Sequence, residues 1–273
     1  MVLPIVACDA KEGSKPGLGM WAWSQSTFTT EPARKEMLGF CMREGIRHID
    51  QHVSIRKHRE SCRVQNAEAL SELITEAAKR NISVNALRGE RAMFFEANHN
   101  RALQQLSAII AFDRRLPATA HLAGIKYDVE PYLTTQWKAG GPQRRKVIRD
   151  YLIFLRKAKK MLDKQAPCLE LSVDVPFWWD NPEFAASFNG SEKLFVHHIQ
   201  DLADWIAIMS YRRDSTEILR LVKTELAYAG QMNRPGCICP AVNTNEIKGA
   251  EHWTTFWGEI GRASCRERVC HRV

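Results

Sequence analysis

The sequence predicts a (β/α)8 barrel that is incomplete after its seventh strand. Seven short apolar strands alternate with six amphipathic helices along 273 residues, and barrels of about 250 residues commonly form one domain. Strands that alternate with helices build parallel sheets. None of the strand-to-helix turns carries a glycine-rich phosphate-binding pattern, which favours a barrel over a doubly wound sheet.

The strands are predicted from short apolar runs, and the helices from apolar residues spaced three and four apart. The predicted strands span residues 18–23, 46–54, 82–87, 123–130, 168–175, 205–211 and 236–242. The predicted helices span residues 31–43, 66–77, 98–112, 142–163, 191–203 and 215–229. Thr30 is the expected N-cap of the first helix, with Pro32 in its first turn.

An eighth strand and helix should follow the segment HWTTFWG, which ends at Gly258. Residues 260–270 instead resemble the translation of a sequencing adapter. We therefore expect residues 1–258 to form a single, incomplete barrel domain and residues 259–273 to be an artefactual tail. The first and seventh strands would then lack their shared neighbour, and unpaired strand edges promote aggregation.

Composition and charge limit the classes of protein to which this chain can belong. The formal net charge is +8, but several arginines lie in the suspected tail, and the basic residues of 143–160 suit the solvated face of a helix. We therefore expect no nucleic-acid partner. No apolar run reaches the roughly 18 residues of a membrane span. The N-terminus lacks the basic and apolar segments of a signal peptide, so a secreted or a cytoplasmic location stays open. We expect a monomer.

Polar residues gather at the carboxyl ends of the predicted strands, where barrel enzymes place their catalytic groups. In the segment GIKYDVEPY, residues 125, 127 and 129 should face the helices, whereas Lys126, Asp128 and Glu130 should point into the barrel mouth. Residues two apart on a strand lie roughly 6–7 Å apart. Two acids at that spacing repel, which should raise the pKa of one of them. Cleavage of a glycosidic bond requires one protonated acid beside an ionised one. The alternative is a structural ion network with Lys126 and Arg88.

The same residues carry a resemblance to a known family. The run GIKYDVE resembles the fourth-strand signature D-G-x-D-x-D-x-E of family-18 glycoside hydrolases, the chitinase group, and IMSYR resembles the M-x-Y-D of their sixth strand. The resemblance implies that Glu130 is the general acid, that Asp128 orients an acetamido group of the substrate, and that Tyr211 hydrogen-bonds to that group. It further implies an oligosaccharide or polysaccharide substrate and no cofactor.

The chain departs from this family pattern at several positions. Ala123, Lys126 and Arg212 stand where the signatures have aspartate, and the third strand has no S-x-G-G motif. These changes alter the charges that surround Asp128. We therefore expect a distant, glycosidase-like barrel rather than a true chitinase.

Further substrate-binding residues are predicted at or after the strand ends. Aromatic rings suit the faces of pyranose sugars, and Asp174 or Asp180 could supply a second carboxylate. The predicted substrate-binding residues are Trp23, Arg88, Tyr132, Asp174, Trp179, Asp180, Tyr211, Arg212 and Asn243.

Two other functions are left open by the sequence. His48, Asp50 and His52 share one face of a strand, and with Glu130 or Asp174 they could bind a divalent metal of a barrel hydrolase. The main interpretation assigns no metal ligands. The other alternative is a non-catalytic carbohydrate-binding barrel that has lost part of its acid machinery.

Overall fold

The predicted barrel fold is confirmed by a computed structural model. The structure describes residues 18–58, 61–234, 236–244, 253–256 and 269–271, and for residues 269–271 it describes the backbone alone. All seven predicted strands are present, and they pair in parallel in the order expected for a (β/α)8 barrel. In barrel order they are β1 (Leu18–Ala22), β2 (Ile46–His52), β5 (Ser83–Arg88), β6 (Gly124–Tyr127), β7 (Glu170–Pro176), β10 (Trp205–Met209) and β11 (Ile238–Val242).

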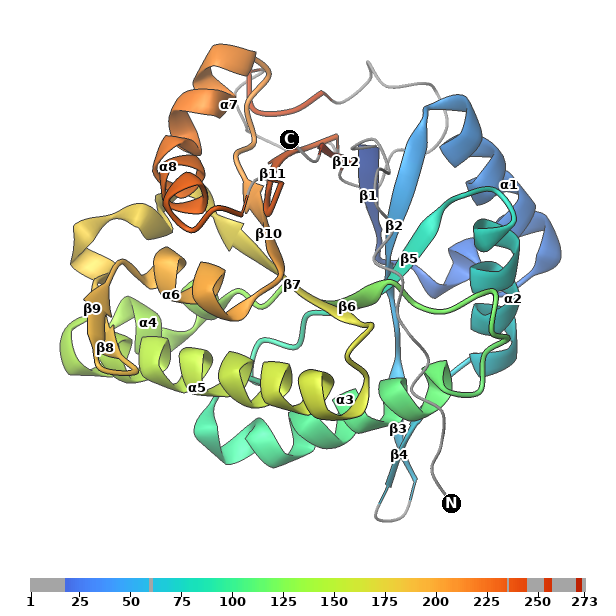
Figure 1. Cartoon of the computed structure of the whole chain (residues 1–273), viewed down its shortest axis with the longest axis horizontal. Coiled ribbons are helices and arrows are strands. Elements are labelled where there is room, and N and C mark those ends of the chain that lie inside the picture. The colour runs from blue at the N-terminus through green and yellow to red at the C-terminus, as the bar shows by residue number, and fades with distance from the viewer. Residues whose placement is uncertain (1–17, 59–60, 235, 245–252, 257–268, 272–273) are drawn as a thin grey trace.

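The helices lie on the outside of these strands (Figure 1). They are α1 (Glu31–Arg43), α2 (Ala67–Ala78), α3 (His99–Asp113), α4 (Thr135–Lys138), α5 (Gly141–Gln165), α6 (Phe195–Leu202), α7 (Ser215–Leu221) and α8 (Lys223–Gln231). Thr30 caps α1 as predicted, because its side chain accepts a hydrogen bond from the Ala33 amide. The predicted helix 215–229 is divided at Val222, whose backbone leaves the helical conformation while its side chain is fully buried.

Two β-hairpins extend from the barrel, and neither was predicted. The hairpin of β3 (Ile55–His58) and β4 (Ser61–Val64) follows β2, and that of β8 (Ala186–Phe188) and β9 (Ser191–Lys193) precedes α6. Asn189 and Gly190 both have positive φ, as the two-residue turns of β-hairpins require. The predicted helix 191–203 therefore begins only at Phe195.

The eighth place in the barrel is filled differently from the prediction. A short strand, β12 (Val269–His271), pairs antiparallel with β1 over three residues and with β11 over two. The expectation that these two edges stay unpaired is therefore wrong, because free backbone donors and acceptors at a sheet edge accept any extended segment that reaches them. Residues 259–268 and 272–273 of the suspected tail, like the N-terminal residues 1–17, lie outside the described residues. Within the described ranges there is no eighth strand–helix unit.

This short closing strand should make unfolding less cooperative than that of a completed barrel. Antiparallel pairing over three residues of β1 and two of β11 leaves two residues of β1 and three of β11 without a partner on this edge. Urea unfolding followed by tryptophan fluorescence and by far-UV circular dichroism should give midpoints that do not coincide. A single sharp, reversible transition seen by both probes would contradict this expectation.

The strands divide the buried side chains into two groups, one between the strands and the helices and one inside the barrel. Residues of one parity, such as Tyr127, pack outward against the helices; the Tyr127 ring lies 5.0 Å from the Phe154 ring of α5. Residues of the other parity fill the barrel, and many of them are polar. No described helix is both long and apolar enough to cross a bilayer.

Candidate functional site

Asp128 and Glu130 follow β6 at the carboxyl end of the barrel. The Asp128 amide donates a hydrogen bond of 2.8 Å to the Arg88 carbonyl, so the pairing with β5 continues one residue beyond the strand. Lys126, two residues earlier, points into the barrel, as its contacts with β2 and β7 show. Asp128 is 6% exposed, and Glu130 is half-buried where the chain turns into a short 3-10 helix, η3 (Pro131–Leu133).

Tyr132 connects the acids to the aromatic residues of the next loop. Its hydroxyl donates a hydrogen bond to Oε1 of Glu130. Its ring meets the half-buried Trp178 ring edge-on at 5.3 Å. Burial, followed by the Glu130 carboxylate, raises the pKa of Tyr132, and Asp128 and Tyr211 add to this shift. The Tyr132 hydroxyl therefore keeps its proton and stays a donor toward Glu130.

Beneath these acids, Lys126 forms a buried ion pair with two aspartates. Its Nζ lies 2.8 Å from Oδ2 of Asp50 and 2.9 Å from Oδ1 of Asp174, and all three side chains are at most 1% exposed. The Trp21 indole donates to Asp174 Oδ2 at 2.7 Å. The Trp21 and Trp205 ring centres lie 4.7 and 4.2 Å from Nζ, within the range of cation–π contacts.

The protonation of this cluster follows from burial and charge. Burial opposes the ionisation of Asp50, but the Lys126 ammonium and His48 hold the pKa of Asp50 below its usual range. Burial raises the pKa of Asp174 to about 6, against the opposing effect of Lys126. Burial disfavours the Lys126 ammonium, yet the two carboxylates hold its pKa above the ordinary value. The centre of the barrel thus already contains a cation.

The residues proposed as metal ligands are engaged elsewhere. His48 Nε2 lies 2.9 Å from Asp50 Oδ1, and its Nδ1 lies 2.7 Å from the Ser83 hydroxyl. The other Asp50 oxygen faces Lys126. His52 lies apart from them, with its ring 5.5 Å from the Trp23 ring. In the described part of the chain no three His, Cys, Asp or Glu residues are grouped to hold a metal, and the donor set does not fit one.

Gly89 allows a close approach of two chain segments at the mouth. A Cβ at this position would lie 2.7 Å from the Asp128 carbonyl and 2.7 Å from the Trp23 ring. The Trp23 side chain therefore packs over the backbone of Gly89, beside Asp128. This contact places the predicted binding residue Trp23 next to the candidate acids.

Three predicted binding residues lie away from the mouth. Asn85 of β5 points into the barrel, and Arg88 lies three residues later on the strand, so Arg88 points outward toward the helices. There it donates a hydrogen bond of 3.1 Å to Gln105 of α3. Trp179 is 0% exposed and packs 4.6 Å from the Phe195 ring. No ring face of Trp179 is left for a sugar.

Asp180 also lies toward the helices. Its charge acts on Glu225 of α8, a carboxyl group whose pKa burial raises to about 8. Asn243 follows β11 and is 4% exposed; its carbonyl accepts hydrogen bonds from Thr255 and from the Phe256 amide. Tyr211 and Arg212 follow β10 and are half-buried.

The structure adds two aromatic residues to the mouth that the predicted site omits. Phe177 and Trp253 both lie close to the Arg212 guanidinium, with ring centres 5.3 and 4.6 Å from its Cζ. Trp253 is 43% exposed. Its position in the segment after the seventh strand was a usable signal, because loops that follow barrel strands line the mouth.

Comparisons with known proteins show which solved structures resemble this fold. No protein-family model matches the chain, and no curated protein matches its sequence. An exo-β-1,4-mannosidase from Opitutaceae bacterium strain TAV5 matches at TM-score 0.57 and 11% identity, over 84% of this chain and 46% of that one. A mutant O-GlcNAc hydrolase from Thermobaculum terrenum matches at TM-score 0.53 and 11% identity, over 86% and 48%. A chitinase from Chromobacterium violaceum ATCC 12472 matches at TM-score 0.48 and 15% identity, over 82% and 68%.

The mannosidase and the O-GlcNAc hydrolase, both above a TM-score of 0.5, show the class of fold. The chain has a glycoside hydrolase-like (β/α)8 barrel fold, with seven parallel strands in the described residues. It spans less than half the length of the mannosidase and of the O-GlcNAc hydrolase.

Proposed function

We propose that this protein is a carbohydrate-active hydrolase that cleaves glycosidic bonds by acid–base catalysis, with Glu130 as the general acid. The observation that carries the proposal is the position of Asp128 and Glu130. Both follow β6 at the barrel mouth, where this fold places its chemistry, and Glu130 is fixed there by the Tyr132 hydroxyl.

The burial of the acids supports separate roles for them. Glu130 is half-buried, so a glycosidic oxygen at the mouth can approach it. Asp128 is nearly buried and suits an electrostatic partner that orients a polar group of the substrate. Asp174 is 1% exposed and held by Lys126 and Trp21, which disfavours it as a second catalytic carboxylate.

A substrate screen tests the proposed function. Aryl glycosides and acetamido-sugar polymers are incubated with the protein in the presence and absence of EDTA, and the released phenol or reducing ends are measured. We expect hydrolysis that EDTA does not change. Hydrolysis that EDTA abolishes would contradict the proposal and favour a metal-dependent hydrolase. Sugar binding without hydrolysis would instead favour the carbohydrate-binding barrel.

Tyr132→Phe should lower kcat by about 10-fold or more, because Glu130 becomes charged as it transfers its proton, and a hydrogen bond to a charged group contributes about 1.5–3 kcal/mol. The ring and its contact with Trp178 remain, so stability should change little. Tyr228→Phe is the matched control, since the Tyr228 hydroxyl contacts Asp201 and Lys193 on the outside of the barrel. Equal kcat for Tyr132→Phe and the unaltered protein would show that this contact does not position Glu130.

A further inference from the structure

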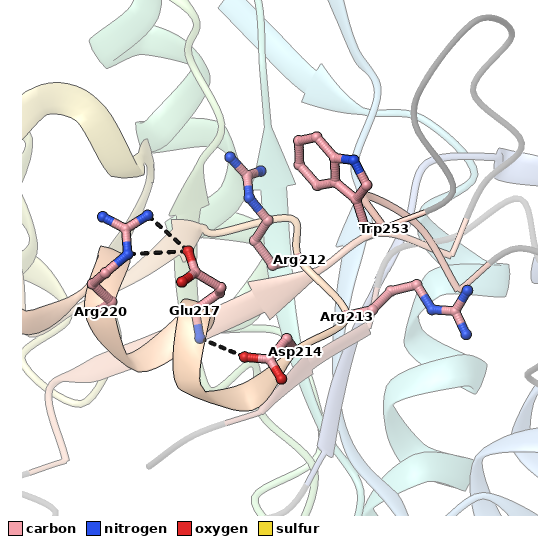
Figure 2. A pocket seen from close by; sticks show the side chains of 6 residues that line it. All are labelled: Arg212, Arg213, Asp214, Glu217, Arg220 and Trp253. Atoms are coloured by element: carbon pink, nitrogen blue, oxygen red, sulfur yellow. Dashed lines mark hydrogen bonds and ion pairs between the residues drawn. The ribbon is translucent and has the colours of Figure 1, made fainter.

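A hollow of about 350 Å³ opens at the carboxyl end of β10. Its lining residues are Arg212, Arg213, Asp214, Glu217, Arg220 and Trp253 (Figure 2). The Arg213 amide donates to the Trp253 carbonyl at 3.0 Å, which holds the segment after β11 against the segment after β10. The proposed function uses none of these lining residues.

The carboxylates of this hollow are held at the start of α7. Glu217 accepts two hydrogen bonds from Arg220, at 3.0 and 2.8 Å. The Asp214 side chain accepts one from the Glu217 amide at 2.9 Å. Figure 2 shows these groups on one side of the hollow, with the Arg212 guanidinium and the Trp253 indole on the other. Glu217 therefore forms its ion pair with Arg220, and the Arg212 charge only adds to the lowering of the Glu217 pKa.

Arg212 retains hydrogen-bonding capacity. Its Nη1 donates to the Tyr211 carbonyl at 2.9 Å, and its remaining contacts are with the Phe177 and Trp253 rings. Within the described ranges Arg212 forms no ion pair. A guanidinium has five N–H donors in a planar fork that matches a carboxylate or a sulfate. Arg212 can thus bind an anionic group without giving up an ion pair inside the protein.

Trp253 supplies a surface for a sugar ring beside this cation. Trp253 is 43% exposed, and the flat, apolar face of an indole suits a pyranose. Arg212 packs against Phe177, the adjacent Trp178 meets the Tyr132 ring at 5.3 Å, and Tyr132 hydrogen-bonds to Glu130. A sugar on Trp253 would therefore lie next to the candidate site of bond cleavage.

We propose that Arg212 and Trp253 form a subsite for a negatively charged sugar unit, one that carries a carboxylate or a sulfate ester. The inference rests on the proposed function in that the sugar bound here belongs to the chain cleaved at Glu130. Arg212 binds the anionic group, and Trp253 packs against the ring that carries it. The subsite then selects acidic polysaccharides over neutral ones.

Binding by isothermal titration calorimetry tests the subsite. The probes are a galacturonic acid tetrasaccharide, a sulfated galactan tetrasaccharide, an N-acetylglucosamine tetrasaccharide and inorganic sulfate. At least one acidic tetrasaccharide should bind about 10-fold more tightly than the neutral one, as a charge-assisted hydrogen-bonded pair allows. Added salt should reduce this preference. The acidic probe that binds more tightly identifies the anionic group.

Variants assign this preference to residues. Arg212→Gln should abolish the preference for the acidic probe and leave the weaker neutral binding unchanged. Arg114→Gln is the matched control and should have no effect, because Arg114 is exposed and contacts the Gln165 carbonyl, away from the hollow. Trp253→Ala should weaken the binding of every sugar. Equal binding of acidic and neutral probes, no effect of Arg212→Gln, or sulfate binding as tight as that of the acidic tetrasaccharide would each overturn the proposal.

The subsite and the proposed function fail in different ways. Binding of acidic sugars that depends on Arg212, without hydrolysis, would reject the catalytic role of Glu130 and keep the subsite. Hydrolysis of neutral polymers that depends on Glu130, with no preference for acidic probes, would reject the subsite and keep the hydrolase.

Discussion

Glu130→Gln should lower kcat by about 100- to 10,000-fold on glycosides with poor leaving groups, the range that a general acid contributes. Glutamine keeps the shape of the side chain and can still accept the hydrogen bond from Tyr132, but it has no acidic proton to transfer to the glycosidic oxygen. KM and sugar binding should change little, because the loss concerns the transition state. Steady-state kinetics and calorimetry on the same preparation measure both quantities.

The leaving group separates acid catalysis from a structural effect. A dinitrophenyl glycoside releases a stable phenolate and needs no proton, so Glu130→Gln should retain much more of its activity on that substrate than on an alkyl glycoside. Glu183→Gln makes the same change at a 55% exposed side chain in the short 3-10 helix η5 (Pro182–Phe184) and should have no effect on kcat. An equal loss on both substrates would show that Glu130 does not act as an acid.

The barrel and the location of its acids were predictable because they depend on short-range periodicity. Seven strands with helices between them specify the parallel order. The alternation of side chains along β6 then places Lys126 and Asp128 on the same side. The same rule, applied to β5, would have placed Arg88 on the helical side, since Asn85 points into the barrel. That error came from ending the predicted strand one residue early.

Other parts of the site depend on contacts that periodicity does not encode. Phe177–Asp180 forms a 3-10 helix, η4, so the alternation of a strand no longer tells which of Trp178 and Trp179 faces the mouth. The structure buries Trp179 and leaves Trp178 half-buried. The partners of Lys126 come from β2 and β7, far apart in the sequence. Only the closure of the barrel brings these charges together.

Lys126→Met should destabilise the fold by about 3–5 kcal/mol at neutral pH, the cost of removing one member of a buried ion pair. The methionine side chain fills a similar volume between the Trp21 and Trp205 rings, so the loss is mainly electrostatic. Asp50 and Asp174 would remain buried without their shared cation. The free energy of unfolding is measured by urea denaturation.

The pH dependence of this loss distinguishes charge from packing. Burial raises the pKa of both aspartates once the ammonium is gone, so in Lys126→Met they protonate as the pH falls, and the uncompensated charge disappears. An acid with a raised folded-state pKa costs stability as the pH rises through that pKa. The destabilisation relative to the unaltered protein should therefore be smaller at about pH 5 than at about pH 7.5. Lys35→Met is the matched control; Lys35 and its partner Glu31 are both 63% exposed, and its urea midpoint should stay unchanged. If Lys126→Met loses the same free energy of unfolding at both pH values, Lys126 acts through packing. The buried ion pair would then be rejected as the feature that holds the barrel interior together.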